Sequence, residues 1–255
     1  MAKRRRCWNQ SVYTKYVNEG RGQGEGKDYK PWIRVQDFAS HGTVSRIYSA
    51  KTNRVHHLLS NNELYYFYLL EWSDRVIDIR EQFPLADIQT AMGIASKSNI
   101  RYPTDNASGF PYVMTCDFMV TTQNGLIART VKQTAELDNP RVMEKLEIER
   151  RYWKRLGIDW KLVTERDIMS QKAKTIEWLR SADPNALRWD KLLVCVAKER
   201  FAESECPISV VANEIEREFS LSPGTGLLLF RHLAQTKQLP IEKVQIPRLE
   251  YSITA

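Results

Sequence analysis

Three side chains in this sequence have the types that metal-dependent phosphodiester chemistry requires. Asp117 and Lys132 lie at the outer ends of two strand-like runs, and Glu63 lies in a helical run upstream. A carboxylate on a rigid sheet can hold a hard divalent cation, while a nearby ammonium can balance charge on a phosphate or an attacking water. These residues predict a metal-dependent nuclease site. A simple cross-strand salt bridge between Asp117 and Lys132 is the alternative.

Residues 117–132, DFMVTTQNGLIARTVK, predict a β-hairpin. Both runs alternate and are rich in β-branched residues, and Asn124-Gly125 between them is a strong turn signal because both positions tolerate positive φ. With these two as the loop residues, Asp117 would lie directly opposite Lys132. One face of the hairpin would then join the core, and the other would end in the charged pair.

Glu63 and Glu149 could each have a structural role in place of a catalytic one. Ser60 followed three residues later by Glu63 is a capping-box pattern that predicts a helix over 60–72, with Glu63 beside an apolar stripe that would pack on the sheet. Residues 140–157 predict a second amphipathic helix, with Glu149 in its stripe. Glu149 is a secondary candidate for holding metal or water, and an ion pair with a neighbouring arginine is the alternative.

The remaining patterns supply a scaffold for these residues. A period-two pattern predicts a strand at 75–85, and residues 158–165 resemble another strand, so that the order is helix, strand, hairpin, helix, strand. Short strands and turns are expected between 32 and 59. Residues 86–112 are polar with little periodicity and are predicted to form an insertion or loops. We therefore expect an α/β fold with a central mixed sheet flanked by helices.

The chain is predicted to divide into a basic N-terminal arm (1–30), a nuclease-like domain (31–168) and a C-terminal domain (169–255). The glycine-rich run at 20–26 lacks the GK[ST] of a phosphate-binding loop and is interpreted as a linker. Basic side chains in the arm are candidates for contacts with DNA phosphates, and a merely solvated tail is the alternative. They are Lys3, Arg4, Arg5, Arg6, Arg21 and Lys27.

The C-terminal domain has helical patterns followed by a ribbon-like run at 243–253, which makes a winged-helix-like module credible. A helical domain that docks a protein is the alternative. The helix expected near 226–238 offers only Arg231, His232 and Lys237 as clear base-reading side chains, which favours docking over sequence-specific reading of DNA.

Composition limits the classes of partner and compartment. The 255 residues carry 38 Lys and Arg against 31 Asp and Glu, a net charge of +7, so nucleic acid is a plausible partner. The four cysteines lack zinc-finger or disulfide-framework spacing. No apolar run reaches the ~20 residues of a membrane span. We expect a cytoplasmic protein that does not enter a membrane.

A carboxylate on a helix, an aspartate entering one strand and a lysine leaving its neighbour together form the constellation of the PD-(D/E)xK nuclease core. Three longer runs carry a more specific resemblance: EGRGQGEGKDYKPW at 19–32, RVHHLLSNNELYYFYLLEWSDRVIDIREQFPL at 54–85 and EKLEIERRYWKRLGIDW at 144–160. With these runs the chain resembles the TnsA family, the endonuclease subunits of heteromeric bacterial cut-and-paste transposases.

The resemblance implies a restriction-endonuclease-like fold in which Glu63 and Asp117 are the catalytic acids and Lys132 is the catalytic lysine. It also implies Mg²⁺, for which Mn²⁺ can substitute, held by the two acids and the Val131 carbonyl. Thr130 stands where the family usually has Gln, and its shorter, neutral hydroxyl is the least secure of the expected ligands.

The resemblance further implies cleavage of DNA at the 5′ ends of a transposon. The expected partners are a TnsB-like DDE transposase that cuts and joins the 3′ ends, and a TnsC-like AAA+ regulator bound through the C-terminal domain. Two other functions remain open. One is a restriction or repair nuclease that acts alone, and the other is a DNA-binding scaffold subunit with a degenerate site.

Overall fold

The computed structural model describes residues 7–37, 43–181 and 189–240. The chain forms two compact units, Met1–Ser170 and Gln171–Ala255. The ribbon predicted at 243–253 lies outside the described residues. In the described part of the chain, no helix is long and apolar enough to cross a membrane.

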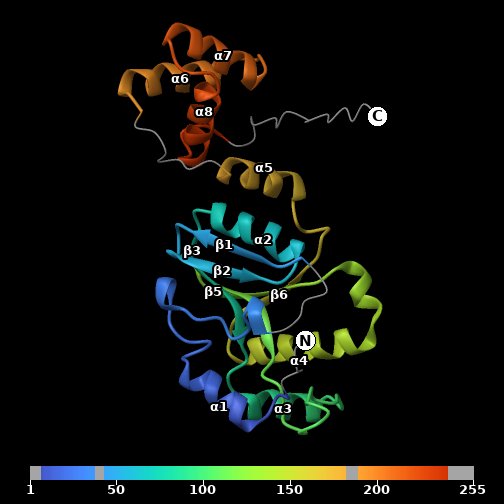
Figure 1. The fold of residues 1–255 in the computed structure, drawn as a ribbon. Helices are drawn as coiled ribbons and strands as arrows, with labels where there is room; N and C mark the ends of the chain where they lie inside the picture. Colours follow the sequence, from blue (N-terminus) through green and yellow to red (C-terminus); the bar gives the residue numbers. More distant parts are fainter. Residues whose placement is uncertain (1–6, 38–42, 182–188, 241–255) are drawn as a thin grey trace, which may run out of the picture. The chain divides into compact units, whose positions relative to one another are not determined.

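A four-stranded mixed sheet forms the centre of the first unit (Figure 1). Its strands are antiparallel from β3 to β5, whereas β6 runs parallel to β5 after a helical crossover. A separate antiparallel pair, β1 and β2, forms a second sheet. The strands are β1 (Ser45–Ser49), β2 (Arg54–Leu58), β3 (Val76–Pro84), β4 (Thr115–Thr122), β5 (Gly125–Val131) and β6 (Asp159–Val163).

Helices cover both faces of the central sheet. On one face Tyr66 of α2 contacts Phe118, and on the other Met119 packs in a cluster with Trp153 of α4. Neighbouring side chains on a strand point to opposite faces, so α2 and α4 lie on opposite sides. This arrangement confirms the predicted mixed sheet flanked by helices. The helices of this unit are α1 (Gln10–Asn18), α2 (Asn61–Trp72), α3 (Ile88–Lys97) and α4 (Pro140–Arg155), with short 3-10 turns at Gly26–Asp28, Val35–Asp37 and Thr134–Asp138.

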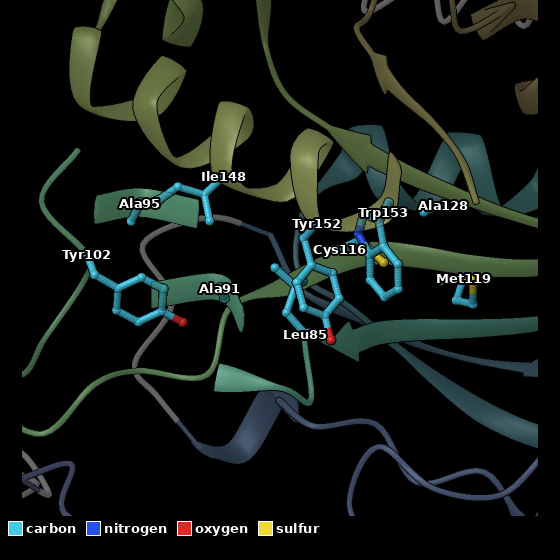
Figure 2. Packing of buried hydrophobic residues seen from close by; sticks show 10 residues of the cluster. All are labelled: Leu85, Ala91, Ala95, Tyr102, Cys116, Met119, Ala128, Ile148, Tyr152 and Trp153. Carbon is cyan, nitrogen blue, oxygen red and sulfur yellow. The ribbon is translucent and has the colours of Figure 1, made fainter. Parts of the chain in front are cut away.

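The core on the α4 side is a dense mixture of small and aromatic side chains. Figure 2 shows this cluster, to which α3, α4 and the sheet all contribute. Its small members Ala91 and Ala95 allow α3 to approach α4 closely, and Tyr152 and Trp153 fill the larger space beside the strands. The buried set is Leu85, Ala91, Ala95, Tyr102, Cys116, Met119, Ala128, Ile148, Tyr152 and Trp153.

Helix α3 contradicts the prediction of loops over 86–112. It begins after Asp87, whose side chain accepts a hydrogen bond from the Thr90 amide at 2.9 Å and so satisfies one of the free N–H groups of the first turn. Its apolar side chains Ile88, Ala91, Met92 and Ala95 follow helical spacing and pack in the core, so the sequence does carry a helical pattern within this mainly polar segment.

The hairpin is present, but its predicted register is wrong by two residues. Thr122 pairs with Gly125, so the loop residues are Gln123 and Asn124 rather than Asn124 and Gly125. Because the shift is even, every side chain keeps its predicted face. The strand-end residues Asp117 and Lys132 therefore still meet, although they are not directly opposite.

The glycine-rich run at 20–26 is folded against the sheet rather than serving as a linker. Gly22, at φ +75°, lies so close to Pro84 that an added Cβ would be 2.4 Å from its ring. Only glycine combines that positive φ with so close an approach. The amide of Gly22 also donates to the Lys30 carbonyl at 2.6 Å. The described part of the predicted arm thus belongs to the first unit, whereas residues 1–6 lie outside the described residues.

A buried ion cluster joins the second sheet to the central sheet. The Glu81 carboxylate on β3 is fully buried and accepts hydrogen bonds from both terminal nitrogens of Arg54, at 2.8 and 2.5 Å, and from His56 Nδ1 at 2.7 Å. Burial alone would raise the pKa of the Glu81 carboxyl, but His56 and Arg54 together hold it well below its usual range. The position of β2 is thereby fixed through charge as well as packing.

The second unit is helical in its described part. Helices α7 and α8 approach closely at Gly226, where an added Cβ would be 2.4 Å from the Ala212 carbonyl. Arg231 on α8 donates to the Trp178 carbonyl at the end of α5, and its guanidinium lies 4.7 Å from the Trp178 ring centre. Arg231 is therefore used within the unit. The helices are α5 (Ser170–Arg180), α6 (Lys191–Glu203), α7 (Ile208–Glu218) and α8 (Thr225–Gln235).

Candidate active site

Glu63 is placed by the cap of helix α2. Ser60 accepts a hydrogen bond from the Glu63 amide at 3.1 Å, and the Glu63 carboxylate in turn accepts from the Ser60 hydroxyl at 3.1 Å and from the Leu59 amide at 3.0 Å. The capping pattern predicted from the sequence is thus confirmed. It also holds the carboxylate at the edge of the central sheet, because the same side chain lies within hydrogen-bonding reach of β3. Glu63 can therefore cap helix α2 and also present its carboxylate to the site.

Asp117 and Lys132 meet where β4 begins and β5 ends. The Asp117 carboxylate accepts from the Val131 amide at 2.7 Å and lies 3.5 Å from the Lys132 ammonium. The ammonium also donates to the Val131 carbonyl at 2.8 Å. The charge of Asp117 raises the pKa of Lys132 and outweighs the opposing effect of burial, so the lysine is an ammonium at neutral pH.

Gln82 connects the two acids. Its side-chain Nε2 donates to Asp117 at 3.2 Å and lies 3.4 Å from Glu63. Its side-chain oxygen Oε1 accepts from the Thr115 hydroxyl at 3.1 Å. This residue is not among the sequence-predicted site residues. A single Gln in the run EQFP has no signal that separates it from an ordinary polar strand residue.

The two acids are an unfavourable pair in the absence of a cation. Burial, and then the nearby charge of Asp117, raises the pKa of Glu63 to about 8. A divalent ion between the carboxylates would remove that repulsion. Within the described residues no three His, Cys, Asp or Glu side chains are grouped to hold a metal, so the available donors are two carboxylates, the Val131 carbonyl and water. This donor set fits Mg²⁺, which usually keeps several waters and binds one or two carboxylates.

Thr130 and Glu149 form a separate buried network beside the acids. The Thr130 hydroxyl donates a short hydrogen bond to the Glu149 carboxylate, and Trp160 Nε1 donates to the same oxygen at 2.9 Å. The expected ion pair of Glu149 with a neighbouring arginine is not formed, since both Arg150 and Arg151 bind Glu147. Burial raises the pKa of Glu149 to about 8, with Asp117 adding to the effect.

The buried Glu149 is expected to make stability depend on pH. Its pKa is about 8 in the folded state against an ordinary value of 4.5, so between these values the folded protein holds a proton that the unfolded chain has lost. Stability should therefore fall as pH rises from about 5 to 8, by ~1.4 kcal/mol per pH unit for each such group. We expect Glu149→Gln to flatten this slope in urea unfolding curves recorded with chelator.

Glu147→Gln is the matched control for that measurement. Arg150 lowers the pKa of Glu147 to about 2, so this carboxyl is ionised in both states above pH 5. Its replacement should leave the slope between pH 5 and 8 unchanged. Parallel curves for wild type and Glu149→Gln would show that Glu149 is ionised in the folded protein.

The predicted DNA contact at Arg21 is wrong. Its side chain is only 6% exposed and pairs with Glu19 at 2.8 Å and Asp37 at 2.5 Å, so its charge is already neutralised. Lys27 is exposed and stays a prediction. The other four candidates, Lys3, Arg4, Arg5 and Arg6, lie outside the described residues.

Together these features define a class: a mixed-sheet nuclease fold with two acids and a lysine at one sheet edge. Comparison with known proteins is more specific. The family model described as TnsA-like endonuclease N terminal matches residues 73–165, and that described as TnsA endonuclease C terminal matches 167–242. The transposon Tn7 transposition protein TnsA of Escherichia coli is 46% identical over 241 residues, covering 91% of this chain and 86% of the relative. The chain belongs to the TnsA family of transposon endonucleases and acts in transposition.

Proposed function

We propose that this chain cuts the 5′ ends of a transposon by Mg²⁺-dependent hydrolysis of a phosphodiester. The observation that carries the proposal is the convergence of Glu63, Asp117 and Lys132, since Lys132 lies 3.5 Å from Asp117 and Gln82 lies between the two acids. A bound Mg²⁺ would supply Lewis-acid stabilisation of charge on the phosphate. Mn²⁺ is expected to substitute, because it prefers the same oxygen ligands.

Glu63, Asp117 and Lys132 would have different roles in the cleavage. Glu63 and Asp117, with the Val131 carbonyl, would hold the cation. Lys132, as an ammonium, cannot take a proton, so its role is to orient the attacking water and stabilise the charge that develops on the phosphate. Thr130 donates to Glu149, and its part in holding the cation is therefore indirect.

The proposed partners are transposon DNA, a TnsB-like DDE transposase that acts on the 3′ ends and a TnsC-like AAA+ regulator. We propose that the regulator binds to the second unit. The use of Arg231 to bind α5 leaves α8 with fewer side chains for reading bases, which favours a docking role.

Strand-mapped cleavage of a donor plasmid, with Mg²⁺ and the partner transposase, tests the proposal. Asp117→Asn keeps an oxygen for the Val131 amide but removes the charge, so the protein should fold while 5′ breaks disappear and 3′ breaks persist. Asp28→Ala, at an exposed aspartate of the same unit, should cut like wild type.

Each alternative function gives a different result in this assay. Equal 5′ breaks with wild type and Asp117→Asn would mean that this site does not cut and that the chain is a scaffold subunit. Cleavage by the isolated protein without partners would instead identify a nuclease that acts alone.

A further inference from the structure

Gln82 is a buried residue whose side-chain amide nitrogen is directed at both acids of the active site. Only 2% of the residue is exposed. An amide nitrogen has two hydrogens, and here one is directed at Asp117, at 3.2 Å, and the other at Glu63, at 3.4 Å. The Thr115 hydroxyl donates to the amide oxygen, at the other end of the amide, at 3.1 Å. The side chain thus spans the two carboxyl groups that would share a cation.

The backbone of Gln82 is as unusual as its side chain. Its φ is +48°, in the left-handed region, although the strand continues on both sides through the pairs Glu81 with Phe118 and Phe83 with Cys116. The backbone carbonyl of Gln82 accepts a hydrogen bond from the Trp32 amide, at 3.2 Å, outside the central sheet. Side-chain-bearing residues in such conformations are costly and concentrate at functional sites. Glycine would adopt this backbone at no steric cost, yet the position holds glutamine.

The two acids need such a connection because they come from different elements. Glu63 is carried by the first turn of α2 and accepts from the Leu59 amide, whereas Asp117 is carried by β4 and accepts from the Val131 amide of β5. Neither contact joins one carboxylate to the other. Apart from Gln82, the described residues provide no side chain that hydrogen-bonds to both carboxylates.

We propose that Gln82 is a positioning residue: its amide sets the separation of the Glu63 and Asp117 carboxylates for a divalent cation, and the left-handed backbone directs the amide between them. The inference rests on the proposed metal-dependent function and deepens it. Residues that orient metal ligands in this way usually change metal affinity or activity ~10- to 100-fold when replaced.

A glycine substitution separates this role from a purely structural one. Gln82→Gly relieves the left-handed backbone but removes the amide and its three hydrogen bonds, so the variant should bind Mn²⁺ ~10- to 100-fold more weakly. Calorimetric titration of the full chain measures the Mn²⁺ affinity, and a thermal melt shows that the variant is folded at the titration temperature. A purely structural residue would change the melting temperature and leave the Mn²⁺ affinity of the folded protein unchanged.

Two further variants complete the design. Asn99→Gly is the matched control, because Asn99 also has a positive φ, of 55°, and makes no contact with the acids; it should leave Mn²⁺ binding unchanged. Gln82→Asn tolerates the left-handed backbone and keeps an amide that is one methylene shorter, so its affinity should lie between those of wild type and glycine. It also carries the test if the glycine variant does not fold.

The outcomes distinguish this inference from the function on which it rests. Wild-type Mn²⁺ affinity in both Gln82 variants would overturn the positioning role and leave the metal site standing. No Mn²⁺ binding by wild type, or equal binding by wild type and Glu63→Ala, would overturn the metal site itself and the positioning role with it.

Discussion

Replacing Lys132 by methionine is expected to abolish 5′ cleavage while leaving the metal site in place. Methionine approximates the length of the lysine stem but has no charge, so the ammonium that contacts Asp117 at 3.5 Å and the Val131 carbonyl at 2.8 Å is lost. Removal of one group that stabilises transition-state charge typically costs about 10²- to 10³-fold in rate. The rate of 5′ strand cleavage with Mg²⁺ and the partner transposase measures the effect.

Binding of Mn²⁺ to the same variant separates the lysine from the acids. Glu63 and Asp117 remain, so affinity should stay near that of wild type. Lys161→Met, at an exposed lysine on the neighbouring strand β6, should retain both cleavage and binding. Undiminished cleavage by Lys132→Met would leave the contact between Lys132 and Asp117 as a salt bridge without a catalytic role.

Replacing Arg54 by methionine is expected to cause the largest loss of stability. The Glu81 carboxylate is fully buried, and Arg54 supplies two of its hydrogen bonds together with the balancing charge. Removal of one partner from a buried ion pair usually costs about 3–5 kcal/mol, because the other charge stays buried without compensation. Urea unfolding at neutral pH should therefore show a free energy of unfolding lower by that amount.

A second substitution and a control test the cause of that loss. Glu81→Gln in the Arg54→Met background removes the uncompensated charge, so part of the lost free energy should return. Arg46→Met, at an exposed arginine on β1, should change stability by less than ~0.5 kcal/mol. If the double variant were less stable than Arg54→Met alone, the charge imbalance would not be the cause.

Much of the candidate site could be predicted because strand and helix periods are local properties. The predicted contact between Asp117 and Lys132 is present although the predicted hairpin register is wrong by two residues, because an even shift keeps every side chain on its face. Glu63 could be located from the Ser60 capping pattern, which needs only four consecutive residues.

The remaining features depend on contacts between distant segments. Gln82 acquires its place from one left-handed residue and from three elements that meet around it, none of which has a pattern in the sequence. The sequence predicts a DNA contact for Arg21 because Asp37, its partner sixteen residues away, cannot be identified from spacing. Basic residues near a chain end are therefore uncertain guides to nucleic-acid contacts.

The corrected hairpin turn offers a practical attachment point for a reporter group. Gln123 and Asn124 are exposed and lie at the end of β4 opposite Asp117. Thr122 is five positions beyond Asp117 along β4, which at about 3.3 Å per residue is a distance of roughly 17 Å. With the exposed Cys7, Cys195 and Cys206 replaced by serine, a fluorophore on a cysteine introduced at Asn124 could therefore follow assembly of the transposition complex without crowding the scissile phosphate.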